Sequence, residues 1–298
     1  MKKPIPVSKR NAVPCCQPPQ LKIAVQTFAT ELSEQAHKIG SHGLSEKEFY
    51  ESGILDGAIE RLRGQKSARM GEKRHFVAQI LNHLQDLKRI HDWTSSGGEN
   101  RFDYHVELLD GRICVIELKG CLDGNNTTIF ERPTNANEFV VWSVCQNKAA
   151  DPEHNVWSGI HVRLGPEIIS RKEPVDGLIV WDYLCGSLAR PCPKISLPGL
   201  PSNRITELGP YSLPPPCLYL FPPTVPSPKD NPSPPPQSLK NVSFMQILHD
   251  VFNGSDDELN FVRWATDIKG VSTRRQVEIE RGGNAVARSG FTTIKRKG

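Results

Sequence analysis

The chain has 298 residues, enough for one large domain or two smaller ones. Apolar residues make up 37% and charged residues 23%, which excludes an intrinsically disordered chain and allows a buried core. The net charge of +4 permits a nucleic-acid partner without arguing for one. No apolar run approaches a membrane span, and the N-terminus lacks the apolar stretch of a secretory signal, so we expect a cytoplasmic protein without a membrane partner.

The first third of the chain predicts helices. Residues 1–20 contain five prolines and predict a loose arm. Residues 21–95 show apolar residues at steps of three and four, which predicts a helical region packed on the core. Its clearest helix covers residues 68–93 and places six apolar side chains on one face: Val77, Ile80, Leu81, Leu84, Leu87 and Ile90.

Residues 96–185 change to short segments rich in β-branched and aromatic residues, which predict strands. Besides a hairpin at 102–120, the predicted strands are 139–144, 159–164 and 177–184. Helices ahead of a run of strands indicate an α/β (α+β) fold with one central sheet flanked by helices. This segment is the predicted core of the protein.

The last two segments differ sharply in composition. Residues 186–238 hold 16 of the 25 prolines, which predicts a linker or surface strap, anchored by residues 217–221, and excludes a central strand. Residues 239–298 begin with helical signals and end in a tail with seven Lys or Arg against two Glu, which predicts a small basic helical lobe. The eight cysteines show no CxxC spacing, and Cys185 and Cys192 lack a second pair to complete a zinc site, so free thiols are expected.

The hairpin at 102–120 carries the residues that point to chemistry. Its Asp110-Gly111 pair fits two turns. A two-residue turn pairs Leu109 with Arg112 and puts Asp103 on the opposite side of the sheet from Glu117. A three-residue turn with left-handed Gly111 pairs Leu108 with Arg112 and sets Asp103 directly opposite Glu117, at about 5 Å between cross-strand neighbours.

The three-residue turn is the one that a metal site requires. It gathers Asp103, Glu117 and Lys119 around one spot, beside the main-chain carbonyl of Leu118, and hard oxygen ligands suit Mg²⁺. Two carboxylates so close repel each other unless a cation lies between them. The structural alternative is a surface hairpin with an ion pair between Asp103 and Lys119, worth about 0–1 kcal/mol.

Asp103, then thirteen residues, then Glu117-Leu118-Lys119 resembles the motif of the PD-(D/E)XK nuclease superfamily, which includes many type II restriction endonucleases. The resemblance covers roughly residues 70–185, and Phe102 stands where the family name has proline. It implies a restriction-endonuclease-like core with a mixed sheet, Mg²⁺ bound by Asp103 and Glu117, and a catalytic Lys119. Members often add an acidic residue from the preceding helix, for which Glu72 is the first candidate and Gln79 the second.

Polar and basic residues outside the hairpin are candidate DNA contacts. Asn125, Asn126, Thr127 and Arg132 follow the lysine-bearing strand, and Asn and Thr side chains can contact base edges or phosphates. Arg163, Arg274 and Arg275 are further basic candidates, while a plain loop or a solvated tail explains the same segments equally well. No phosphate-binding glycine loop is present, which excludes a Walker-type NTPase.

These observations favour a Mg²⁺-dependent endonuclease that hydrolyses DNA phosphodiester bonds, a site-specific type II restriction enzyme acting on double-stranded DNA. Cutting both strands predicts a homodimer, and a restriction system adds a cognate DNA methyltransferase. One alternative is a DNA-binding protein whose nuclease-like fold is not catalytic. Another is a structure-specific DNA-repair nuclease.

Overall fold

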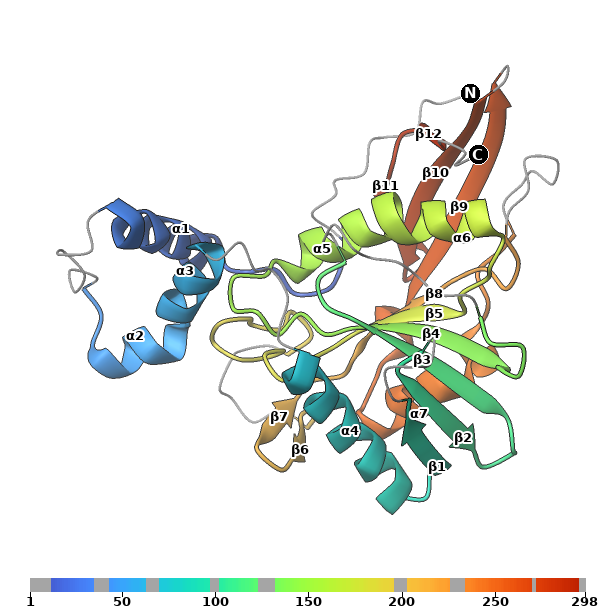
Figure 1. The fold of residues 1–298 in the computed structure, drawn as a ribbon, viewed down its shortest axis with the longest axis horizontal. Coiled ribbons are helices and arrows are strands. Elements are labelled where there is room, and N and C mark those ends of the chain that lie inside the picture. The colour runs from blue at the N-terminus through green and yellow to red at the C-terminus, as the bar shows by residue number, and fades with distance from the viewer. Residues whose placement is uncertain are drawn as a thin grey trace.

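The structure, a computed structural model, describes residues 12–34, 43–62, 70–96, 102–122, 132–195, 203–225, 234–269 and 272–294. Its main feature is one mixed sheet of ten strands in the order β1-β2-β3-β4-β5-β8-β9-β10-β11, with β12 also paired to β10 (Figure 1). Helices flank this sheet, so the predicted mixed α/β class is confirmed at that level. Within the described ranges no helix is long and apolar enough to cross a bilayer.

The first half of the sheet is an antiparallel meander followed by two parallel strands. The strands are β1 (Ile90–Ser95), β2 (Tyr104–Leu108), β3 (Ile113–Lys119), β4 (Glu138–Ser143) and β5 (Gly177–Val180). β1, β2 and β3 pair antiparallel, and β4 and β5 run parallel to β3. β4 and β5 are buried along their whole length, as expected for parallel strands covered on both faces.

The second half extends the same sheet. Its strands are β8 (Cys217–Leu220), β9 (Asn260–Lys269), β10 (Ser272–Arg281), β11 (Asn284–Arg288) and β12 (Thr292–Ile294). β8 is antiparallel to β5 and parallel to β9, and so it joins the two halves. β6 (Thr206–Leu208) and β7 (Tyr211–Leu213) form a separate small hairpin.

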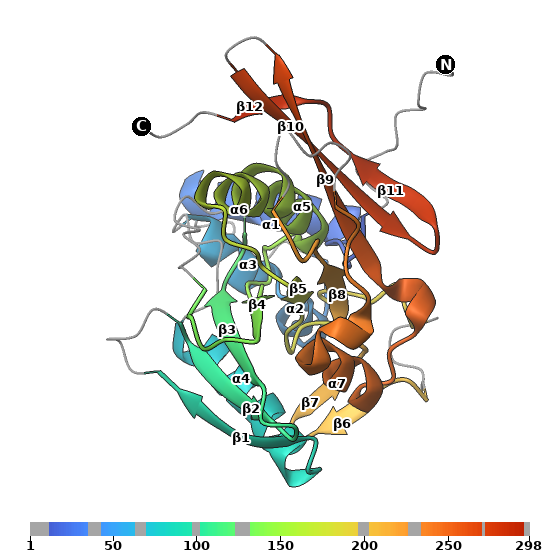
Figure 2. The same cartoon turned by 90° about the vertical axis from the view of Figure 1, so that its right-hand side faces the viewer.

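Helices cover the two faces of the sheet and enclose two apolar cores (Figures 1 and 2). α4 (Met70–Asp86) and α7 (Ser243–Val251) share one core. The second core is shared by α5 (Pro152–Ser158), η3 (Gly159–Leu164) and α6 (Gly165–Arg171). Two short turns, η4 (Leu239–Asn241) and η5 (Asp256–Glu258), flank α7.

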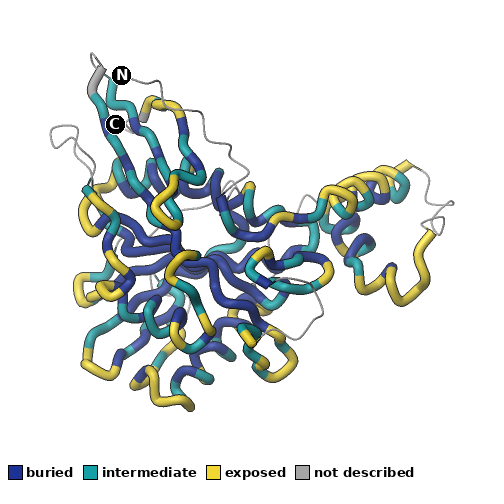
Figure 3. The backbone as a smooth tube through the Cα atoms, turned by 180° about the vertical axis from the view of Figure 1, so that it is seen from behind, coloured by how far each residue is buried: buried dark blue, intermediate teal, exposed yellow. Residues whose placement is uncertain are grey.

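Three N-terminal helices form a unit to one side of the sheet (Figure 1). They are α1 (Pro19–Glu34), α2 (Glu46–Ser52) and α3 (Ile54–Leu62), and they bury a small core of their own. Ion pairs of Lys22 with Asp151 at 3.1 Å and of Lys148 with Asp56 at 2.8 Å join them to the loop before α5. The prediction of helices in 21–95 is right, but only α4 lies on the sheet, while much of the α1–α3 unit is exposed (Figure 3).

Two predicted elements have the wrong secondary structure. The helix predicted to reach residue 93 ends at Asp86, because Lys88 adopts a left-handed φ of 53° and the chain then enters β1. The strand predicted at 159–164 is the helical turn η3. Ile160 and Leu164, four residues apart, are both buried, whereas Val162 between them is half exposed, which is helical rather than strand spacing.

The predictions for the C-terminal part need larger corrections. Residues 217–220 form β8, a central strand, because the prolines stand on either side of this short apolar run and none lies inside it. The predicted helical lobe holds one helix, α7, followed by the long strands β9 and β10. Val277 and Ile279 alternate with half-buried polar residues along β10, a period of two that indicates a strand.

Candidate active site

The hairpin between β2 and β3 has the three-residue turn. Leu108 N–H donates to the Arg112 carbonyl at 2.8 Å, Gly111 N–H donates to Leu108 at 3.0 Å, and Gly111 has a left-handed φ of 79°. The strand register pairs Glu107 with Ile113 and Tyr104 with Ile116. One step further, this register sets Asp103 opposite Glu117, so the predicted register is confirmed.

Asp103, Glu117 and Lys119 lie together where β2 begins and β3 ends. The Asp103 carboxylate accepts a hydrogen bond from Leu118 N–H at 2.8 Å, which ties its side chain across the strands. The Lys119 ammonium donates to Glu117 Oε1 at 2.5 Å. The lysine partner is therefore Glu117, not the Asp103 of the structural alternative.

The Leu118 carbonyl has the orientation that a ligand needs. Carbonyls alternate from one side of a strand to the other. Ile116 C=O accepts from Asp103 N–H on the β2 side, while Lys119 C=O accepts from Val144 N–H on the β4 side. Leu118 C=O therefore points to the β2 side, beyond the first residue of that strand and next to Asp103.

Glu117 is held in an unfavourable environment for a charged carboxylate. Its side chain is 2% exposed, and Oε2 is buried with no hydrogen-bond partner in the described part of the chain. Burial raises the pKa of Glu117 from 4.5 to about 7, the Asp103 charge adds to this, and Lys119 opposes it. At neutral pH the carboxylate is about half protonated, and a nearby cation would shift it to the charged form.

Helix α4 brings two basic residues to this spot. Arg74 pairs with Asp103 at 3.7 Å. Lys73 is 6% exposed, and burial lowers its pKa, while the charge of Asp103 raises it and the charge of Lys119 lowers it further. The Tyr104 hydroxyl donates to the Arg74 carbonyl at 3.2 Å and so fixes the start of α4 against β2.

The acidic residue expected from this helix is not at the site. Glu72 is exposed and its charge acts on Tyr183 instead. Gln79 is half buried, and none of the described contacts joins either residue to the hairpin carboxylates. The α4 side chain that the structure brings to the hairpin is Lys73, because it lies three, four and seven positions before Phe76, Val77 and Ile80, on the apolar face of α4.

The site offers few ligands to a metal ion. Across the described ranges, no group of three or more His, Cys, Asp and Glu side chains could hold one. Asp103 and Glu117 supply two carboxylates, and the unpartnered Glu117 Oε2 has a lone pair available. This set fits Mg²⁺, which is commonly bound by one or two carboxylates and completes its shell with waters and substrate phosphates.

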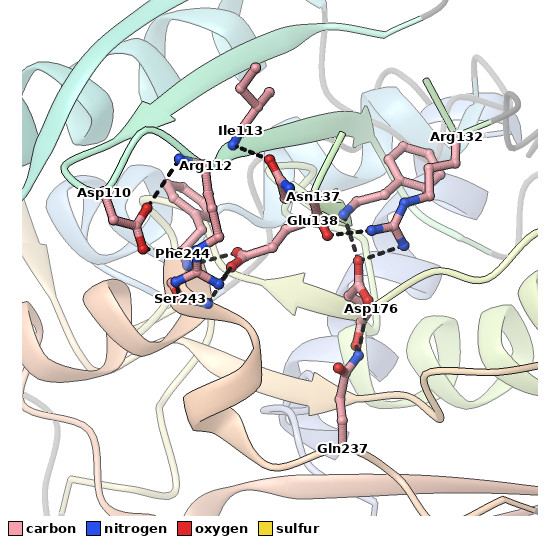
Figure 4. A network of polar contacts seen from close by, with 11 residues as sticks. Asp110, Arg112, Ile113, Arg132, Asn137, Glu138, Asp176, Gln237, Ser243 and Phe244 are labelled. Atoms are coloured by element: carbon pink, nitrogen blue, oxygen red, sulfur yellow. Dashed lines mark hydrogen bonds and ion pairs between the residues drawn. The ribbon is translucent and has the colours of Figure 1, made fainter. Parts of the chain in front are cut away.

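Those candidate DNA contacts that the structure describes are not gathered at this site. Asn125, Asn126 and Thr127 lie outside the described residues. Arg132 is used within the protein, since it pairs with Asp176 at 3.0 Å and donates to the Asn137 carbonyl (Figure 4). Arg163 is half buried on η3.

The other two candidates, Arg274 and Arg275, lie next to each other on β10. Arg274 pairs with Asp267 on β9, and its guanidinium stands over the Phe291 ring at 5.1 Å from the centroid. Arg275 is buried. The two adjacent arginines therefore have different surroundings, since Arg274 is ion-paired and Arg275 is buried.

Comparison with known proteins finds no match for this chain. No family model matches the chain, and no curated protein or solved structure matches it either. The likeness to the PD-(D/E)XK nucleases stays a likeness of three residues on one hairpin. The function has to be argued from the geometry of that hairpin and of the helix beside it.

Proposed function

We propose that this protein is a Mg²⁺-dependent endonuclease that hydrolyses DNA phosphodiester bonds, of the site-specific type II restriction kind. The observation that carries the proposal is the buried Glu117 carboxylate opposite Asp103, with a pKa of about 7 and an oxygen that has no partner. Such a carboxylate is unfavourable for folding, and a bound cation offsets that cost. A purely structural hairpin gains nothing from it.

Each residue then has a role. Asp103, Glu117 and the Leu118 carbonyl would hold Mg²⁺. The ion, when bound, polarises a phosphate oxygen and offsets the negative charge of the transition state. Asp103 is already positioned by Leu118 N–H and Arg74, so this ligand would be in place before a metal ion binds.

Lys119 changes partner in this scheme. Its hydrogen bond to Glu117 occupies Oε1 and leaves Oε2 without a partner among the described residues. When Glu117 binds a metal, its charge is shared and Lys119 becomes available to hold the attacking water or a phosphate oxygen. Lys73 and Arg74, which the charge of Asp103 attracts, supply positive charge for the scissile phosphate.

The reaction is a hydrolysis. The water oxygen forms a bond to phosphorus, the P–O bond to one sugar breaks, the water loses a proton to solvent, and the departing sugar oxygen gains one. Cutting both strands of a duplex with one site per chain is most simply done by a symmetric dimer. A restriction role also calls for a methyltransferase that protects the host DNA.

Digestion of a mixed panel of plasmid and phage DNA with Mg²⁺ tests the proposal. EDTA should abolish discrete fragments because it removes the ion. Lys119→Ala should abolish them as well, with at least about a 100-fold loss of rate, because removing one group that stabilises transition-state charge costs on the order of 10²–10³ in rate. Lys22→Ala is the matched control, since Lys22 is an exposed lysine whose ion pair, with Asp151, lies outside the hairpin. Equal cutting by wild type and Lys119→Ala would reject the assignment.

A non-catalytic DNA-binding protein is the second candidate. The 2.5 Å contact between Lys119 and Glu117 favours it, because a lysine already engaged by a carboxylate can be a structural ion pair. Intact DNA under all conditions, with duplex binding retained, would establish this reading. Cutting confined to branched or flapped DNA would instead identify a structure-specific repair nuclease.

A further inference from the structure

Arg275 on β10 is a buried cation that has no counter-charge among the described residues. The residue is 5% exposed, and its Nε and Nη1 are enclosed with no hydrogen-bond partner in the described residues. Burial is the cause that lowers the pKa of Arg275 to about 10, and no carboxylate acts against it. An enclosed guanidinium of this kind is strongly unfavourable unless something supplies negative charge.

Another buried arginine, Arg190, offers a comparison. Arg190 is fully buried, pairs with Asp182 at 3.0 Å and donates to the Cys145 carbonyl, while its Nε is enclosed without a partner in the described residues. Asp182 holds the pKa of Arg190 above its ordinary value even though burial lowers it. Among the described residues, Arg190 therefore has a carboxylate and a carbonyl as partners, and Arg275 has neither.

The neighbours of Arg275 on the sheet are polar as well. The register pairs Arg275 with Thr266 on β9 and with Thr292 on β12. Directly opposite residues share a face, with Cβ atoms about 5 Å apart. Thr266 is 2% exposed, and the Thr292 hydroxyl is buried without a partner.

Arg275, Thr266 and Thr292 form a polar row across three strands, and this row lies next to the apolar core. Trp264 and Val277, the next pair on the same face, belong to the core shared with α5 to α6. Apolar side chains would continue that core at no electrostatic cost. The row instead has a guanidinium between two hydroxyls, which together donate to the oxygens of an anion.

The guanidinium has one open edge. Nη2 is not among its enclosed atoms, and none of the residues that the structure describes forms a hydrogen bond with it. An anion that arrives there meets Nη2 first, and a small rotation of the side chain brings a second nitrogen into a forked contact. A forked contact of this kind matches two oxygens of one phosphate.

We propose that Arg275, with Thr266 and Thr292, binds a phosphate group, and that this group is a backbone phosphodiester of a bound nucleic acid. The site lies on the long strands β9 and β10, which extend past α6 (Figure 2). It is separate from the Asp103 and Glu117 hairpin. The choice of a nucleic acid as the source rests on the proposed function, whereas the phosphate site does not.

Two binding measurements in EDTA test the site, with Arg204→Met as the control, because Arg204 is an arginine already paired with Glu258 at 2.6 Å. The first is the melting temperature in phosphate against chloride at equal ionic strength. Wild type should gain about 2–4 °C and Arg275→Met nothing. The second is anisotropy of a labelled duplex, where Arg275→Met should weaken binding about tenfold and reduce the slope against log salt by about 1.

The two measurements together test the phosphate site and the nucleic-acid source separately. Loss of both responses in Arg275→Met supports the backbone site. Loss of the phosphate response alone makes the ligand free phosphate or a nucleotide and overturns the nucleic-acid source. Equal responses in wild type and Arg275→Met, or no response to either probe in wild type, overturn the site.

A folding defect would not block the test. If Arg275→Met does not fold, Arg275→Lys keeps the charge and removes the fork, and it should lose most of the phosphate response. An unchanged response in that variant overturns the forked contact. Because both measurements run without metal, a protein that does not cut DNA can still show the site.

Discussion

Glu117 and Glu138 lie on neighbouring strands, and each side chain is 2% exposed, yet their surroundings are opposite. Glu138, at the start of β4, accepts from Ser243 N–H at 2.7 Å and from Phe244 N–H at 2.9 Å (Figure 4). It thereby caps α7, and Arg112 adds a third donor at 3.4 Å. Glu117, at the end of β3, has Lys119 on one oxygen, and its other oxygen has no partner in the described part of the chain.

The difference shows how a buried carboxylate can be assigned to structure or to function. Burial raises the pKa of both residues, so the direction of that shift does not separate them. The hydrogen bonds do separate them. Buried polar groups in folded proteins are almost always satisfied, and an exception at a cluster of charges is a candidate ligand site.

The largest expected effect is at Glu138. Glu138→Gln should lower the free energy of unfolding by about 2–4 kcal/mol, because the amide nitrogen faces a backbone N–H of α7 and leaves a buried donor unsatisfied. Urea denaturation followed by circular dichroism measures this. A change below about 0.5 kcal/mol would show that Glu138 is not part of the helix cap.

The same substitution at Glu117 should have the opposite sign. The folded pKa of about 7 lies above the ordinary 4.5, so the native state binds the proton more tightly and stability falls as pH rises through this window. Glu117→Gln has no titrating group at this position, so it does not lose stability as the pH rises through this window. At pH 8 in EDTA it should raise the free energy of unfolding by on the order of 2 kcal/mol.

Near pH 5 the two proteins should be almost equally stable, because Glu117 is then protonated in the native state. Glu107→Gln on β2 is the control and should stay within about 0.5 kcal/mol of wild type at both pH values. A Glu117→Gln variant that is less stable than wild type at pH 8 would show that the carboxylate is structural.

Metal binding is the smallest effect and the most direct link to the proposed site. With 10 mM Mg²⁺ and a Kd of about 1 mM, wild type should gain about 1 kcal/mol, and Glu117→Gln should gain nothing. The gain should be larger at pH 8 than at pH 6, because the ion binds the deprotonated carboxylate. Isothermal titration with Mg²⁺ at the two pH values measures it, and equal heats from both proteins would contradict the metal site.

The hairpin was predictable because its cause is local. Asp110-Gly111 predicts a turn but fits two registers, and the one that a metal site requires, with Asp103 opposite Glu117, is the one observed. Lys73 lies on the predicted apolar face of α4, but nothing in the sequence showed that this face meets the hairpin. The charges that act on Glu117 are those of Lys119 and Asp103 in the hairpin, whereas no spacing rule reveals the burial of Glu117.

The C-terminal half was not predictable from local signals. β8 has four residues within a proline-rich segment, and its place depends on β5 and β9, about forty residues away on either side. Arg274 and Arg275 look alike in the sequence. Their difference arises from Asp267, which reaches one face of β10 only.

The position of β8 also determines how the polypeptide can be divided. Gly177 pairs with Leu220 and Tyr219 pairs with Asn260, so removing β8 would leave two bare strand edges within one sheet. A truncation before residue 217 would expose the β5 edge to other chains and favour aggregation. Two fragments separated before β8 would each have a strand edge that pairs with the other, and these edges would allow the fragments to reassemble. The proline-rich segment is therefore a suitable place to split the protein into two fragments. It is a poor place for a domain boundary, because β8 belongs to the central sheet.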